Sequence, residues 1–120
     1  MKIVDIKTAV VAYHGKATLV RVDTDEGLSG YGEANPDAGA AAIVGLISEL
    51  KSELIGEDPR NVERCWEKLR RRHVFSGPQA GIFLIALSGI EIALWDLAAK
   101  AAGQPLYRLL GGKFRDRIRL

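Results

Sequence analysis

The feature that most constrains this chain is a long apolar segment that ends at Gly103. Its pattern predicts one helix from about Gln79 to about Ala102, followed by the helix-ending residues Gly103 and Pro105. A helix that is apolar around most of its circumference is buried on most of its sides. The rest of a 120-residue chain covers only part of those sides, so we expect either a further part of the protein or a second copy to cover another. The polar positions of the helix are Ser88, Glu91, Asp96 and Lys100.

The first third of the chain has the pattern of an antiparallel sheet. Residues 3–12 are rich in β-prone side chains, residues 17–22 alternate between two faces, and residues 28–34 form a third run. A turn at residues 23–27 links the second run to the third. Short links between neighbouring strands predict a three-stranded meander.

The third of these runs has an unusual face. Gly30, Gly32 and Ala34 lie on one side of the strand, whereas Tyr31 and Glu33 lie on the other. A face without large side chains lets another element come close to the strand backbone. The sequence therefore predicts a close contact between residues 30–34 and another element.

Two shorter helices are predicted between the sheet and the apolar segment. Asp37 is the expected N-cap of the first, and Gly56 suits its end. The pair Asp58-Pro59 predicts the start of the second, because Asp caps helices and proline suits the first helical position. The predicted fold class is therefore α+β, a three-stranded antiparallel meander followed by a bundle of three helices. The apolar stripes are Ile43, Ile47, Leu50 and Leu54 in the first helix, and Val62, Cys65, Trp66 and Leu69 in the second.

Charge and cysteine content narrow the class of protein. Seventeen basic residues nearly balance fifteen acidic ones, so nothing favours nucleic acid or a membrane surface as a partner. The basic run Lys68–Arg72 is interpreted as a solvated helix end. Cys65 is the one cysteine and cannot form an internal disulfide, which indicates a reducing compartment. With no apolar leader at Met1–Asp5, we expect a cytoplasmic protein, and we interpret Cys65 as a buried hydrophobic residue.

The residues themselves do not form a self-contained active site. His14 and His73 are far apart in the sequence, and no zinc or calcium ligand spacing occurs. The glycines near residue 30 end a strand instead of opening a helix, which excludes a dinucleotide fingerprint. Gly111-Gly112-Lys113 lacks the remaining residues of a phosphate loop. The sequence therefore predicts no catalytic residue and no metal ligand within this chain.

Six motifs follow one another along the chain: Met1–Ile3, Leu19–Gly27, Gly30–Ala34, Leu54–Pro59, Ala86–Asp96 and Leu109–Lys113. In this order and spacing they resemble the N-terminal capping domain of the enolase superfamily, in the mandelate racemase and muconate-lactonizing group. Within that group, the short link Tyr13–Lys16 is similar to that of acid-sugar dehydratases of the galactonate dehydratase type.

The resemblance implies an activity that this chain does not complete alone. In the family, a domain like residues 1–113 covers the mouth of a (β/α)₇β barrel, which binds Mg²⁺ and removes the proton α to a substrate carboxylate. Residues 114–120 would start the first strand of that barrel, so the chain lacks the catalytic residues and is expected to be inactive alone. The implied role is the specificity cap of a Mg-dependent acid-sugar dehydratase.

The same resemblance implies the partners: the C-terminal barrel of the same enzyme, a small carboxylate substrate and further copies in a homo-oligomer. Two alternatives stay open. One is a racemase, epimerase or cycloisomerase on the same scaffold, because these enzymes share the first proton abstraction. The other is a freestanding, non-catalytic binding or oligomerisation module.

The resemblance also implies the positions that face the substrate. Lys16 or His14 would meet an anionic or hydroxylated substrate, although a turn that faces solvent is the alternative for each. The stretch His73, Val74 and Phe75 is expected at the seam between cap and barrel, with simple loop packing as the alternative. The two substrate-facing loops are Tyr13, His14, Gly15 and Lys16, and Asn35, Pro36 and Asp37.

Overall fold

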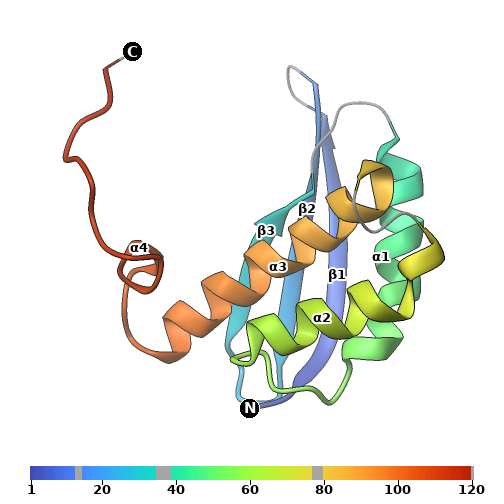
Figure 1. The fold of residues 1–120 in the computed structure, drawn as a ribbon, viewed down its shortest axis with the longest axis horizontal. Coiled ribbons are helices and arrows are strands. Elements are labelled where there is room, and N and C mark those ends of the chain that lie inside the picture. Colours follow the sequence, from blue (N-terminus) through green and yellow to red (C-terminus); the bar gives the residue numbers. More distant parts are fainter. Residues whose placement is uncertain (13–14, 35–38, 77–79, 120) are drawn as a thin grey trace.

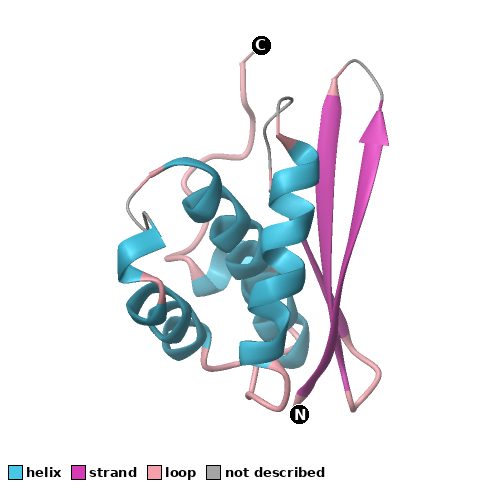
Figure 2. Cartoon of the chain, turned by 90° about the vertical axis from the view of Figure 1, so that its right-hand side faces the viewer, coloured by secondary structure: helices cyan, strands magenta, loops and turns pink. Residues whose placement is uncertain are grey.

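Three strands pair in chain order, β1-β2-β3, in the computed structural model, which describes residues 1–12, 15–34, 39–76 and 80–119. Both pairings are antiparallel, and the helices pack on one face of the sheet (Figure 1, Figure 2). The described part of the chain is therefore a two-layer α+β structure. The predicted fold class is confirmed.

The strands span Ile3–Ala12 (β1), Lys16–Thr24 (β2) and Ser29–Glu33 (β3). The second strand is longer than predicted, because Asp23 and Thr24 still pair with β1. The turn that follows is correspondingly short. Thr24 donates its hydroxyl hydrogen to the carbonyl oxygen of Leu28 at 2.8 Å, and Gly27 adopts a positive φ of 81°.

The helices span Ala40–Leu54 (α1), Val62–Arg72 (α2) and Gly81–Ala101 (α3), with a 3₁₀ turn at Val74–Ser76 (η1) and a short helix at Leu106–Leu109 (α4). The predicted end of α3 is confirmed, since Gly103 follows it with a positive φ of 61°.

Both predicted N-caps are wrong. Gly39, with a φ of 91°, is the N-cap of α1, and Asp37 lies outside the described residues. Asn61 is the N-cap of α2, three residues after Asp58. Asp58 begins a turn instead, in which the amide of Asn61 donates to the Asp58 carbonyl oxygen. Asp followed by proline is a turn signal as well as a helix-start signal, and here the turn comes first.

The core lies between the sheet and the helices. The inward face of β2 is fully buried at Thr18, Val20 and Val22, as its alternation predicts. The apolar stripes of α1 and α2 pack there too, with Trp66 only partly buried. The largest fully buried side chains from the helices are Ile43, Ile47, Leu50, Leu54, Leu69, Leu87, Ile90, Leu94 and Leu97.

The apolar sequence of helix α3 is related to its position in the domain. In the described part of the chain, it is the one helix that is long and apolar enough to cross a membrane, with a mean hydropathy of 1.9. Half of that segment is buried against the sheet and the other helices. Burial inside the domain therefore accounts for part of its apolar sequence.

The chain after α3 extends away from the body of the domain (Figure 1). No residue of α4 is buried, and residues 113–119 are exposed and in neither a helix nor a strand. A strand needs a neighbour with which to pair. That residues 114–120 open a second domain therefore stays a prediction.

Candidate functional site

The structure describes only part of the predicted substrate-facing loops. Five of their residues lie outside the described residues, and Gly15 and Lys16 lie within them. Gly15 has a positive φ of 129°, so this turn favours glycine. Lys16 is exposed and starts β2 opposite Ala12. The residues outside are Tyr13, His14, Asn35, Pro36 and Asp37.

The described neighbours of these loops meet at one end of the sheet. Lys16 pairs with Ala12, and Leu19 on the same strand pairs with Glu33 at the end of β3. Helix α3 begins at this end as well, because a Cβ placed on Gly39 would lie 3.6 Å from Cδ1 of Ile82. The fold thus gathers the flanks of both predicted loops and the start of α3 at the upper end of the sheet in Figure 1.

Helix α3 lies directly on β3, as the glycine face predicts. A Cβ on Gly30 would be 2.0 Å from the carbonyl oxygen of Ala93, and one on Gly32 would be 2.2 Å from that of Gly89. Gly89 in turn leaves room for Ala34. The last described residue before the second predicted loop is therefore held against the backbone of α3.

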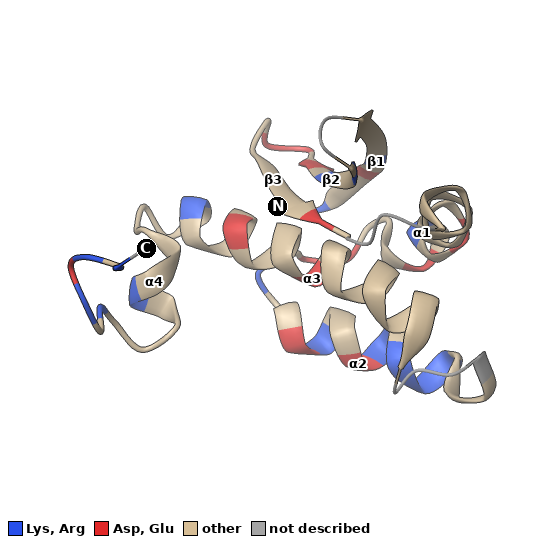
Figure 3. Cartoon of the chain, turned by 90° about the horizontal axis from the view of Figure 1, so that it is seen from above, with Lys and Arg blue, Asp and Glu red and all other residues tan. Residues whose placement is uncertain are grey.

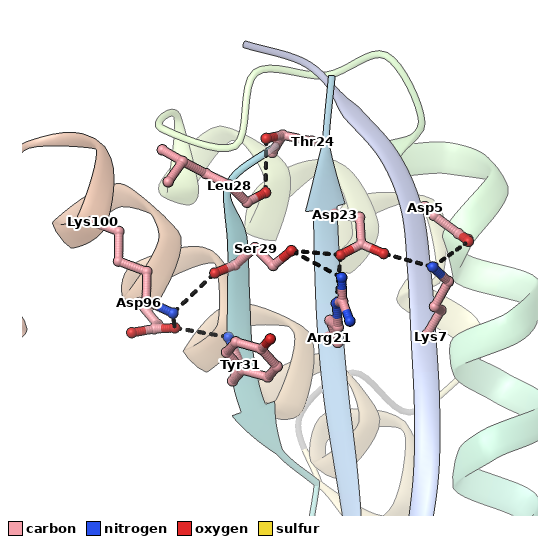
Figure 4. A network of polar contacts seen from close by, with 10 residues as sticks. All are labelled: Asp5, Lys7, Arg21, Asp23, Thr24, Leu28, Ser29, Tyr31, Asp96 and Lys100. Atoms are coloured by element: carbon pink, nitrogen blue, oxygen red, sulfur yellow. Dashed lines mark hydrogen bonds and ion pairs between the residues drawn. The ribbon is translucent and has the colours of Figure 1, made fainter. Parts of the chain in front are cut away.

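Two side chains of α3 bind the free edge of β3. Asp96 Oδ2 accepts a hydrogen bond from the amide of Tyr31 at 2.9 Å, and Lys100 Nζ donates to the carbonyl oxygen of Ser29 at 2.9 Å (Figure 4). The same two side chains form an ion pair at 2.6 Å. Edge strands expose unpaired backbone groups to which other strands can add, and this pair occupies two of them. Sequence analysis placed both residues on a polar stripe and did not predict this role.

The outer face of the sheet carries a network of charges centred on Asp23 (Figure 4). Its carboxylate accepts hydrogen bonds from Lys7 at 2.8 Å, from Ser29 at 2.7 Å and from Arg21 at 2.6 Å. The Lys7 ammonium, with Ser29 and Arg21, lowers the pKa of Asp23 to about 2. A carboxylate with so low a pKa is a poor general base near neutral pH, so the network stabilises the sheet and does not provide a catalytic base.

The predicted seam segment is divided between two environments. His73 is partly buried, with Nε2 2.6 Å from Oε1 of Glu53 and its ring 5.3 Å from that of Phe83. Val74 and Phe75 are exposed, and Phe75 is fully exposed to solvent. His73 thus joins α1 to α3, whereas the next two residues present apolar surface. Their place at a seam stays a prediction.

Chemistry at Cys65 is disfavoured by its burial. The thiol is fully buried, and burial raises its pKa to about 11. Its interpretation as a small hydrophobic core residue is confirmed. Within the ranges that the structure describes, no group of three or more His, Cys, Asp or Glu side chains is placed to hold a metal ion. The described residues therefore do not fit a magnesium site, and no chemical step is assigned to a metal in this domain.

The family assignment follows from comparison with known proteins. The family described as mandelate racemase / muconate lactonizing enzyme, N-terminal domain, matches residues 2–111. The chain belongs to this family. The resemblance found in the six sequence motifs is confirmed.

Relatives of the N-terminal domain include dehydratases of sugar acids. The chain is 41% identical over 101 residues to a D-galactonate dehydratase of Verminephrobacter eiseniae and 41% identical over 119 residues to a D-xylonate dehydratase of Haloferax volcanii. These matches cover 84% and 99% of the chain but 26% and 28% of the two relatives. The chain thus spans little more than a quarter of the length of either protein.

A solved structure shows the same domain within a longer chain. A mandelate racemase/muconate lactonizing protein from Paracoccus denitrificans, complexed with magnesium, matches with a TM-score of 0.87 and 35% identity. The match covers 95% of this chain and 31% of that protein. The sheet and helices described above therefore correspond to less than a third of that longer protein.

Proposed function

We propose that this domain is the specificity cap of a Mg-dependent acid-sugar dehydratase, whose catalytic residues lie in a C-terminal barrel. The observation that carries the proposal is the equal identity, 41%, to a D-galactonate and a D-xylonate dehydratase. Both named substrates are sugar acids, so the shared domain supports the class of substrate and not one sugar. The 120-residue chain alone is expected to be inactive.

The geometry fits a cap better than a catalytic unit. The flanks of both predicted loops lie at one end of the sheet, and α3 fixes the end of β3 there. A rigid scaffold with loops at one end suits substrate selection and exclusion of water from a neighbouring active site. By contrast, the pKa of Asp23 is lowered and that of Cys65 is raised, so neither suits catalysis near neutral pH.

Magnesium is proposed for the C-terminal domain, with support from the related protein that is complexed with magnesium. Bound there, the ion would stabilise the negative charge that develops when a base removes the proton α to the substrate carboxylate. Loss of the neighbouring hydroxyl then gives an enol, which becomes a 2-keto-3-deoxy acid. Net loss of one water distinguishes this reaction from racemisation.

The test uses the full-length protein that carries this domain. It would be incubated with Mg²⁺ and a panel of sugar acids, with formation of a 2-keto acid as the readout and EDTA as the control. We expect a 2-keto product from at least one sugar acid and none after chelation. Exchange of the α-proton for deuterium without a keto product would instead identify a racemase or epimerase. No exchange with any carboxylate would favour a non-catalytic module.

Lys16 is the described residue that we propose as a specificity determinant. It is exposed at the start of β2, next to the first predicted loop. In the full-length enzyme, Lys16→Met is expected to raise KM for the sugar acid with little change in kcat, because binding and not chemistry loses a cation. Lys2→Met, an exposed position before β1, is the matched control and should change neither. Equal effects of the two variants would exclude this role for Lys16.

A further inference from the structure

Three sides of α3 are covered within this chain. Its Gly89 and Ala93 contact β3 directly, and Phe83, Ile90 and Leu94 are buried in the core with α1 and α2. The fourth side lies between the edge of β3 and α2. Seen from above in Figure 3, no described element lies over α3 between the sheet and α2.

This fourth side is an apolar stripe at helical spacing, Ile85, Ser88, Ile92 and Trp95, which we call the α3 stripe. Ile92 is 46% exposed, and the other three are partly buried. Its polar atoms have partners on the same helix: Ser88 Oγ donates to the Leu84 carbonyl oxygen, and Trp95 Nε1 donates to Glu91 Oε1. The stripe therefore suits an apolar partner, which need not supply hydrogen bonds.

The surface next to the stripe is hollowed. Trp95 and Val62 line a cavity of about 330 Å³ at the start of α2, whose other lining residues are polar or charged: Arg60, Asn61, Glu63 and Arg64. A shallow cavity beside exposed aliphatic carbon is the shape that receives a side chain at a domain interface. The stripe and the cavity form one continuous surface, because Trp95 belongs to both.

The outer face of the sheet is also uncovered, and it combines a hollow with a network of charges. Leu19 and Tyr31 line a mostly apolar cavity of about 340 Å³ there, together with Lys7 and Arg21. Both of these cations bind Asp23, and the Tyr31 ring lies between Arg21 and Lys100. Such a face keeps its charges in water at little cost, whereas burial under another domain would desolvate them. The four residues of the α3 stripe carry no ionised side chain, so burial of the stripe itself has no such desolvation cost.

The direction in which the chain continues after α3 favours one partner for the stripe. The chain leaves α3 through α4, where Leu109 and Leu110 are exposed by 41% and 61%. The related dehydratases contain far more chain, of which this domain spans 26% and 28%. A domain joined to the end of α3 is present at a high effective concentration next to the stripe, unlike a second copy, which must arrive by diffusion.

We propose that the α3 stripe is the docking surface for the C-terminal domain of the same chain. The proposal rests on the proposed function only for the identity of that domain. The sequence predicts His73, Val74 and Phe75 at the seam between cap and barrel, and this proposal adds Ile92 and Trp95 as the main contact. Val74 and Phe75 then flank the interface or remain in solvent.

The test is thiol labelling of the full-length enzyme at two matched positions. Ile92→Cys places a thiol on the stripe, and Leu19→Cys places one on the outer face of the sheet, at native exposures of 46% and 42%. Cys65 adds little background in this domain, because it is buried and its pKa is raised to about 11. Labelling of each residue is followed by mass spectrometry of its peptide, with the denatured protein as reference.

We expect residue 92 to react more slowly than residue 19 by roughly tenfold or more in the native enzyme, and equally fast after denaturation. Equal rates in the native enzyme would overturn the proposal. Protection that disappears when an oligomer is diluted to monomers would overturn it too, by assigning the stripe to a second copy. Protection that persists in the monomer supports it even if every sugar acid fails as a substrate, so the two proposals fail separately.

Discussion

Two neighbouring sides of α3 are covered to very different degrees within this chain. On the side of β3, Gly30 and Gly32 bring two backbones so close that a single methyl group would overlap a carbonyl oxygen. On the side of the α3 stripe, Ile92 is nearly half exposed. The first contact is complete within this chain and tolerates no added atom, whereas the second depends on a surface from elsewhere. The difference indicates which side holds the domain together and which side joins it to a partner.

The largest expected effect is at the glycine contact. Gly30→Ala would place a Cβ 2.0 Å from the carbonyl oxygen of Ala93 and 2.7 Å from Cβ of Leu97, so α3 would have to move away from β3. We expect a loss of about 4 kcal/mol in the free energy of unfolding, or failure to fold. Urea denaturation followed by circular dichroism measures it.

The control for this substitution lies on α1. Gly45 is exposed, and a Cβ there would meet nothing within 4 Å. Gly45→Ala should raise the free energy of unfolding by about 0.5–1 kcal/mol, because alanine favours helix and restricts the unfolded chain. If both substitutions were equally tolerated, the close contact between α3 and β3 would be wrong.

The next effect compares the two sides of α3 at residues of the same type. Ile90 is 1% exposed and Ile92 is 46% exposed. We expect Ile90→Ala to lower the free energy of unfolding of the 120-residue chain by about 3 kcal/mol, and Ile92→Ala by about 0.5 kcal/mol. Differential scanning calorimetry of both variants provides the comparison. Similar losses would mean that this chain already covers the stripe.

A smaller effect is expected at the edge of β3. Asp96→Ala removes the acceptor for the amide of Tyr31 and the partner of Lys100, and should lower the free energy of unfolding by about 1.5 kcal/mol. Asp96→Asn keeps an acceptor oxygen and should recover part of the loss. Hydrogen exchange of the Tyr31 amide measures the local effect. An unchanged exchange rate in Asp96→Ala would exclude the proposed hydrogen bond.

The smallest effect on the free energy of unfolding is expected on the outer face of the sheet, where ion pairs of Asp23 contribute to stability. The pKa of Asp23 is lowered from 3.8 to about 2, chiefly by its hydrogen bond with Lys7. A lowered folded-state pKa gives stability above the ordinary pKa, which is lost as the pH falls from about 4 to about 2. The wild type should therefore exceed Asp23→Asn by about 1 kcal/mol at pH 7 and by much less near pH 2. A constant gap in urea titrations across this range would contradict the ion pair.

The sequence predicts the parts of the fold that depend on residue spacing. The strands follow from alternation, and the close contact of α3 with β3 follows from Gly30 and Gly32 on one face. The start of α2 was misplaced, because Asp58-Pro59 suits a turn as well as a helix. The sequence does not predict the contact of Asp96 and Lys100 with the edge of β3, because it joins residues more than sixty positions apart. The one available signal is an Asp and a Lys four positions apart on a largely apolar helix.

The candidate site was less predictable for a physical reason. A cap contributes loops to a site that another domain completes, so its residues carry no spacing that fixes their chemistry. Lys16 and His14 were identified by position in the family alone, and His14 lies outside the described residues. The partial burial of His73 beside Glu53 depends on how η1 turns after α2, which no short sequence signal sets.

The central claim is that one side of α3 is built to be covered by another domain, and dye binding by the isolated 120-residue chain tests it most directly. A hydrophobic dye should bind the folded chain, and Ile92→Asp should remove most of the fluorescence, whereas Val4→Asp, at a native exposure of 50%, should leave it largely unchanged. No dye binding by the folded chain, or equal loss in the two variants, would contradict the claim.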